Sequence, residues 1–222
     1  MTEPSVKGAM LLLSVVAIRR MKQGAELAGK EFEQSFSPQA RSFLERVGDL
    51  PEGAFEKSLS AETLALLEEE IVITSWYPMW QFNELEEFLW VHLSKRDPEL
   101  ARMAGAEAFR SMQKTGRYQQ LEYAERAGNA TSSHDVIRQT RLIISILSSY
   151  YNFLEVEVDL DPVNRDLRIT YDNAALICEP LRYSTEGFMT AVSRLRNDAV
   201  EWTSQRVSPD RIVFTLPNSR RQ

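Results

Sequence analysis

The chain has 222 residues, 43% of them apolar, which is enough to bury a large core without a disulfide or metal staple. Acidic residues outnumber basic ones by 32 to 26, and the formal charge of −6 argues against DNA or RNA as the main partner. One cysteine, Cys178, forms no internal disulfide, and together with the two histidines, His92 and His134, it is too little for a usual zinc site. The composition favours a globular protein of a reducing cytoplasm.

The longest apolar run covers residues 9–18, about half the ~20 residues that a membrane-spanning helix needs. Glu3 precedes the run and Arg19 and Arg20 follow it, which is the reverse of the charge order in a secretory signal. We therefore expect a buried element and no membrane-spanning segment.

Up to about Tyr151 the apolar residues recur at the three- and four-residue steps of helices. Residues 8–23 predict the first helix, although their runs of leucine and valine leave a strand open. Capping residues and first-turn prolines predict the other helix starts. These starts are Ser37 with Pro38, Ser60, Pro78, Asp97 with Pro98, and Ser132. The helix after Pro78 should run to about Lys95, and the next one to about Gly116.

After Phe153 the apolar residues alternate, as they do in strands with one wet face. We expect one hairpin from residues 154–160 and 167–171, a helix over 186–197, and a second hairpin from 199–207 and 211–216. This order predicts a four-stranded antiparallel sheet with one helix on a face.

The fold class that follows is α+β. A helical subregion over 6–151 packs on the sheet subregion over 152–217, with the order strand, strand, helix, strand, strand. No repeat, low-complexity tract or long linker divides the chain, so we expect a single domain over 1–222.

The stretch Trp76-Tyr77-Pro78 is expected to form a structural corner, with Trp76 buried, that docks the following helix on the core. Trp80 and Trp90 lie on different sides of that helix. One of them therefore faces away from the core, which is typical of a partner or dimer interface.

Four short sequence features carry a resemblance to known proteins. Val6-Lys7-Gly8 enters the first helix, Trp76-Tyr77-Pro78 precedes a long helix, and Gly105 and the step Thr185-Glu186-Gly187-Phe188 lie on later helices. With the helical half and the interrupted sheet, this pattern resembles the heme-nitric-oxide/oxygen-binding superfamily and its relatives, the 4-vinyl-reductase domain and transport-particle subunits. Within that group it is most similar to uncharacterised paralogues of myxobacteria and other deltaproteobacteria.

The resemblance departs from the heme-binding members at their heme contacts. Those members supply a proximal histidine and a Tyr-x-Ser-x-Arg motif for the heme carboxylates. Here Arg182, Tyr183 and Ser184 are adjacent, and in an extended strand adjacent side chains point to opposite faces. We therefore expect no bound heme and no other cofactor.

His92 is the one histidine with apolar neighbours in a helical stretch, so it is the candidate axial ligand of a heme. A hydrogen-bonded histidine at the flank of the core is the favoured interpretation. His134 falls in a first helical turn and is expected at the surface.

Cys178 follows Leu176 and Ile177, which favours a buried, inert thiol over a reactive one. The glutamates occur in pairs and triplets that favour solvated faces over a glycosidase or metal site. These are Glu68 to Glu70, Glu86 and Glu87, and Glu155 with Glu157.

No catalytic or metal site emerges, so the sequence favours a non-enzymatic regulatory domain of a bacterial cytoplasm that binds a protein partner or an apolar small molecule. The alternative is a heme or tetrapyrrole sensor with His92 as axial ligand. A homodimer is also expected as a possible assembly. The candidate binding residues are Trp76, Tyr77, Trp80, Trp90 and His92.

Overall fold

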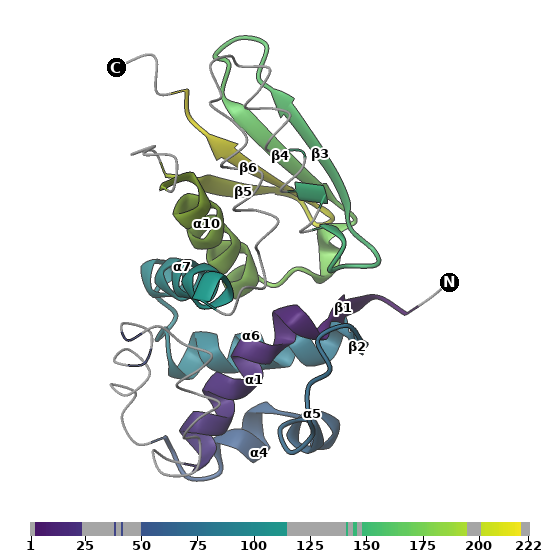
Figure 1. The fold of residues 1–222 in the computed structure, drawn as a ribbon, viewed down its shortest axis with the longest axis vertical. Coiled ribbons are helices and arrows are strands. Elements are labelled where there is room, and N and C mark those ends of the chain that lie inside the picture. The colour runs from purple at the N-terminus through teal and green to yellow at the C-terminus, as the bar shows by residue number, and fades with distance from the viewer. Residues whose placement is uncertain are drawn as a thin grey trace.

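A computed structural model describes residues 3–23, 50–114, 148–194 and 201–218, together with five isolated positions. These are Pro38, Arg41, Arg141, Ile144 and Ser145. The expected helix after Ser37 and Pro38, and most of the one after Ser132, lie outside the described residues. Figure 1 shows a layer of helices below a sheet, with two further helices between them. The α+β class and the carboxy-terminal antiparallel sheet are thus confirmed.

The first helix is α1, Gly8–Gln23, and β1, Ser5–Lys7, leads into it. Side chains all around α1 are buried, among them Leu11, Val15 and Ile18. A helix that is covered on every side shows little periodicity, which is why its sequence left a strand open. The helix prediction is confirmed.

The helical layer continues with α4, Ala54–Ser58, α5, Ala61–Leu66, and α6, Met79–His92. Ser60 caps α5 as predicted, because its Oγ accepts a hydrogen bond from the Thr63 N–H at 3.2 Å. The helix α6 ends before the expected Lys95, since Lys95 and Arg96 have left-handed backbones with φ of 51° and 60°.

Two helices lie between the helical layer and the sheet (Figure 1), and they pack on each other through glycine. They are α7, Pro98–Lys114, and α10, Glu179–Arg194. A Cβ on Gly105 would overlap the backbone carbonyl of Ser184, and one on Gly187 would overlap that of Arg102. The two backbones are therefore in direct contact.

The start of α10 corrects the prediction. The expected helix began at Glu186, but α10 begins at Glu179, with Pro180 in its first turn. Arg182, Tyr183 and Ser184 are therefore helical, so the assumption of an extended strand was wrong at these residues. Pro180 in the first turn is a start signal of the same kind as Pro98, and the sequence prediction did not use it.

The sheet has the strand order β3-β4-β6-β5, and every neighbouring pair is antiparallel. Its strands are β3, Glu155–Leu160, β4, Leu167–Asp172, β5, Thr203–Ser208, and β6, Arg211–Leu216. The short helix η1, Ala174–Leu176, connects β4 to α10. Asp161 turns the first hairpin, because its Oδ1 accepts from the N–H groups of Val163 and Asn164. The first expected hairpin is confirmed. The second is confirmed as a pair of strands, but its first strand begins at Thr203 and not at the expected residue 199.

The core of the sheet lies on the face formed by alternate residues of β4 and β6. Ile169 pairs with Phe214, and both are buried with Tyr171 and Ile212. Figure 1 shows α10 beside the sheet, against β5 and β6. Among the helices in the described ranges, none combines the length and apolar character needed to cross a bilayer.

The Trp76-Tyr77-Pro78 stretch is a strand, β2, Trp76–Pro78, which pairs with β1. Trp76 is 48% exposed and lies under the Lys7 ammonium, 5.2 Å from the ring centroid. The expectation of a buried Trp76 was therefore wrong, because Trp76 pairs with Lys7 on the wet side of the ribbon. Tyr77 has the anchoring role instead, since its hydroxyl accepts from the Val72 N–H at 2.9 Å.

The contact between α7 and α10 leads to a stability prediction. Alanine in place of glycine normally stabilises a helix by about 1 kcal/mol. Because a Cβ at residue 105 would overlap the Ser184 carbonyl, we expect Gly105→Ala to lower the free energy of unfolding by about 1–3 kcal/mol. Urea titration measures this, with Met103→Ala on the exposed face of α7 as control. A stabilised Gly105→Ala variant would contradict the packing.

Trp202 and Trp76 differ in solvent exposure, so we expect their replacement to differ in its effect on stability. Trp202 is 4% exposed and its Nε1 donates to Ser193 Oγ at 2.9 Å. We expect Trp202→Ala to cost about 3–5 kcal/mol, and Trp76→Ala at most about 1 kcal/mol because only a surface cation–π contact is lost. Thermal unfolding of the two variants tests the ranking. Equal losses of stability in the two variants would show that Trp76 is buried, as the sequence predicted.

Candidate functional site

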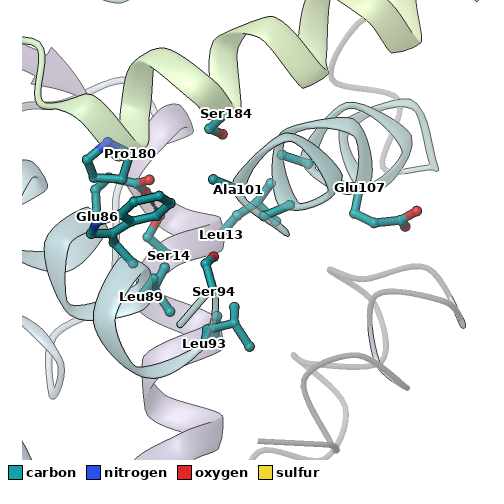
Figure 2. Close-up of a pocket in the computed structure, with 14 residues that line it drawn as sticks. Leu13, Ser14, Glu86, Leu89, Leu93, Ser94, Ala101, Glu107, Pro180 and Ser184 are labelled. Carbon is teal, nitrogen blue, oxygen red and sulfur yellow. Dashed lines mark hydrogen bonds between the residues drawn. The ribbon is translucent and has the colours of Figure 1, made fainter. Parts of the chain in front are cut away.

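Two adjoining cavities lie where α1 and α6 meet α7 and α10. The helical cavity lies among these four helices (Figure 2). The sheet-side cavity extends from the same point to Tyr151 and to Tyr171 of β4. The residues that line both are Leu13, Ser14, Glu86, Ala108 and Ser184. The cavities thus join at Ser14 and Glu86 and lead from the helical layer to the sheet.

Small side chains make room for the helical cavity. Ala101, Ala104 and Ala108 of α7 recur at steps of three and four, so they lie on one face of that helix. Ala17 of α1 faces them across the space. The remaining apolar lining comes from longer side chains. These are Leu13, Leu89, Trp90, Leu93 and Pro180.

Glu86 is the central polar residue of both cavities. It projects from α6, and its Oε1 accepts a hydrogen bond from Ser14 Oγ at 2.5 Å. Figure 2 shows Glu86 beside Ser14 and Pro180. Burial raises the pKa of Glu86 to about 7, and the Ser14 hydrogen bond opposes the rise. The carboxyl group therefore changes charge near neutral pH.

Two phenols close the sheet-side cavity. Tyr171 is 5% exposed and packs on Phe214 with ring centroids 5.0 Å apart. Burial raises the pKa of Tyr151 and of Tyr171, and the neighbouring Tyr171 and Glu86 add to the rise at Tyr151. Neither hydroxyl bonds to any residue in the part of the chain that the structure describes. Both phenols remain neutral and belong to residues that line the cavity, without a described hydrogen-bond partner.

The charge of the cavity walls is one-sided. The described residues that line the two cavities include no lysine, arginine or histidine. The second carboxylate, Glu107, forms an ion pair with Arg110 on the same helix. In Figure 2 it points away from Glu86. Glu86 is thus the lining carboxyl without a described cationic partner.

The candidate binding residues predicted from the sequence do not lie together in the structure. Trp90 lines the helical cavity and stacks on Tyr183, with ring centroids 5.9 Å apart. His92 lies near the end of α6 with its ring 4.5 Å from Phe88 and is absent from the lining of both cavities. Burial lowers the pKa of His92, so the ring is neutral at pH 7.

The other three candidates lie at the opposite end of α6. Trp80 is 41% exposed, and Trp76 and Tyr77 belong to β2. Exposed Val72 and Ile73 precede them in sequence. The use of this exposed apolar region by a partner or a second copy remains a prediction.

Sequence reasoning missed Glu86, Ser14, Tyr151 and Tyr171. Glu86 was interpreted as part of a solvated face, which is wrong for this residue, because it is half-buried and lines both cavities. Its position four residues after Phe82 and three before Leu89 placed it within the apolar stripe. That spacing was the available signal. For the exposed Glu87, Glu155 and Glu157 the solvated interpretation is confirmed.

Cys178 is half-buried, and burial raises the pKa of its thiol, with Glu86 adding to the effect. A protonated thiol is a poor nucleophile, as expected for an inert cysteine. In the described ranges no group of three or more metal-ligating side chains comes together.

Comparison with solved structures identifies the fold. An H-NOX protein from S. oneidensis in the Fe(II)NO ligation state matches with a TM-score of 0.50 and 11% identity, over 96% of this chain and 99% of that one. The chain has the H-NOX fold. An H-NOX mutant from K. algicida, Fe(II) unliganded, matches with the same TM-score and identity, over 97% of this chain and all of that one.

These matches show a likeness of fold to H-NOX proteins. No protein-family model matches the chain, and no curated protein matches it in sequence. The narrower resemblance to the myxobacterial paralogues stays a prediction.

The pKa of Glu86 predicts a pH dependence of stability. Folding raises this pKa from about 4.3 in the unfolded chain to about 7. The folded state therefore holds the proton more tightly, so stability is greatest below the unfolded pKa and falls as pH rises through the folded one. We expect a loss of about 3 kcal/mol between pH 4 and pH 8 from this group.

Chemical denaturation at pH 5 and pH 8 measures the loss. We expect Glu86→Gln to reduce the difference between the two pH values, because an amide does not titrate. Glu157→Gln, the same change on an exposed strand face, is the control. An unchanged difference in Glu86→Gln would show that the carboxyl is not desolvated.

Proposed function

We propose that the chain is a non-enzymatic regulatory domain that binds an apolar small molecule in the two joined cavities. The observation that carries the proposal is an apolar cavity lining that includes polar side chains without a hydrogen-bond partner among the described residues, the buried Tyr171 above all. Buried polar groups are nearly always hydrogen-bonded in folded proteins. A ligand that reaches them satisfies their hydrogen-bonding capacity and covers the apolar walls together.

The chemistry of the site favours binding over catalysis. Cys178 is protonated, and the one carboxyl without a described cationic partner, Glu86, has only Ser14 as a hydrogen-bond donor. A general acid–base pair or an activated nucleophile needs a second group within hydrogen-bond reach and oriented by a third. The described lining supplies only the Ser14–Glu86 hydrogen bond for such a set, with no described third group that orients it.

The fold family implies heme, so the cavity residues were compared with what heme needs. Heme brings an iron that takes an axial ligand, and two anionic propionates that need cationic or hydrogen-bonding partners. The described lining offers a carboxyl at its centre, no histidine and no cation. These residues do not fit heme.

The arginine nearest the expected motif is already bound. Arg182 Nη2 contacts Glu179 at 2.6 Å, and its Nη1 donates to the Ser204 carbonyl at 3.1 Å. It is also buried against Glu186. A guanidinium held by two carboxylates has little capacity left for a propionate. The alternative of a heme sensor through His92 is therefore the weaker one.

The position of the cavities gives the domain a means of signalling. A ligand at Glu86 touches α1 and α6 on one side and α7 and α10 on the other. Because α10 also contacts β5, a shift of α10 on binding is transmitted to the sheet. Differential contacts in the bound and free states are what such regulation requires.

A neutral fluorescent probe tests the cavity. We expect N-phenyl-1-naphthylamine to bind with a one-to-one rise in fluorescence, because its apolar rings match the lining. Ala108 lines both cavities, so Ala108→Phe fills the space at their junction. We expect this variant to bind at least about tenfold more weakly, through overpacking and steric overlap.

Met103→Phe adds the same ring to the exposed face of α7 and is the matched control. Equal binding by both variants, or none by the parent protein, would overturn the proposal. Titration with hemin supplies the opposing test. A stoichiometric Soret band that His92→Ala abolishes would favour the heme sensor instead.

A further inference from the structure

The central carboxyl of the cavities can only accept a hydrogen bond when it is ionised. Its Oε1 accepts the hydroxyl proton of Ser14. The second carboxyl oxygen of Glu86 accepts from no residue in the described ranges. Tyr151 and Tyr171 line the sheet-side cavity, and neither hydroxyl has a hydrogen-bond partner among the described residues. A bound donor can therefore meet the carboxylate and the two phenol oxygens as acceptors.

The electrostatics of the same point favour a positive charge. Glu86 has no described cation beside it, and Glu107 is neutralised by Arg110. The partly exposed Arg102 of α7 and the buried Arg182 of α10 both pair with Glu186, which is 1% exposed and lies outside the cavity lining. An anionic head group would find no counter-charge among the described lining residues, and burying it unpaired beside a carboxyl is costly.

We propose that the occupant is an apolar molecule bearing a primary ammonium group, which binds between Glu86 and the phenols of Tyr151 and Tyr171. This inference rests on the proposed function and names the ligand class for that cavity. The ammonium has three N–H donors, and the cavity supplies a carboxylate and two phenol oxygens. The apolar body lies against Leu13, Ala108 and their neighbours.

The proposed site predicts how the affinity of ligands depends on their head group. An ammonium forms a charge-assisted hydrogen bond to Glu86, which is about twice as strong as a neutral one. An alcohol of the same chain length keeps the hydrogen bond and loses the charge. A carboxylate of the same length is repelled by Glu86 and gains no cation. The expected ranking is therefore amine, then alcohol, then acid.

Displacement of the neutral probe N-phenyl-1-naphthylamine measures the ranking with decylamine, decanol and decanoate at pH 8. We expect decylamine to displace the probe at a concentration at least about tenfold lower than decanol does. Decanoate is expected to be the weakest of the three. If decanoate displaces the probe as well as decylamine does, the ligand class is wrong while the cavity proposal stands. If the probe itself does not bind, the cavity proposal fails first.

Two variants of α6 separate the site from the general acidity of the surface. Glu86→Gln and Glu87→Gln remove the same charge from adjacent residues, of which Glu87 is exposed and lines neither cavity. We expect Glu86→Gln to lose most of the preference of decylamine over decanol, and Glu87→Gln to keep it. Equal losses would overturn the role of Glu86. The ranking in the parent protein tests the ligand class even if Glu86→Gln folds poorly.

Discussion

The backbone contact between α7 and α10 is the constraint on which the rest of this structure depends. It requires glycine on both sides, Gly105 against the Ser184 carbonyl and Gly187 against the Arg102 carbonyl. The ion pair between the partly exposed Arg102 and the buried Glu186 lies beside the crossing and stabilises it, with Arg102 Nε 2.5 Å from Glu186 Oε2. Because α10 also contacts the sheet at β5, and α6 on its other side, this crossing joins the helical layer to the sheet.

The cavities follow from the same crossing. Close approach of two helices needs small residues, and α7 continues its small face beyond Gly105 to Ala101, Ala104 and Ala108. Where α10 covers that face, the backbones touch. Where α1 and α6 face it instead, small side chains leave space, and Glu86 with Ser14 lies in that space. A raised pKa at Glu86 is the energetic cost of placing a carboxyl there, since burial disfavours its charged form.

Much of the fold could be predicted from the sequence, because its signals are local. Alternation over β3 and β4 and the turn at Asp161 specify a hairpin within a few residues. The exposure of Trp76 and the start of α10 at Glu179 depend on pairing with distant segments, which periodicity does not report. The residues of the candidate site were harder to predict than the fold. Tyr151, Tyr171 and Glu86 come from an irregular segment, a strand and a helix, and they meet only in the tertiary structure.

The comparison with H-NOX proteins separates what a fold conserves from what a site requires. A TM-score of 0.50 over nearly the whole chain shows that the arrangement of helices and sheet persists at 11% identity. The chemistry inside the fold is set by a few side chains and need not persist with it. A central carboxyl with phenols beside it attracts donors and cations, whereas a heme requires an axial ligand and partners for two anions. One scaffold can therefore enclose a cavity in either case, while the side chains that line the cavity set the chemical groups it can hold.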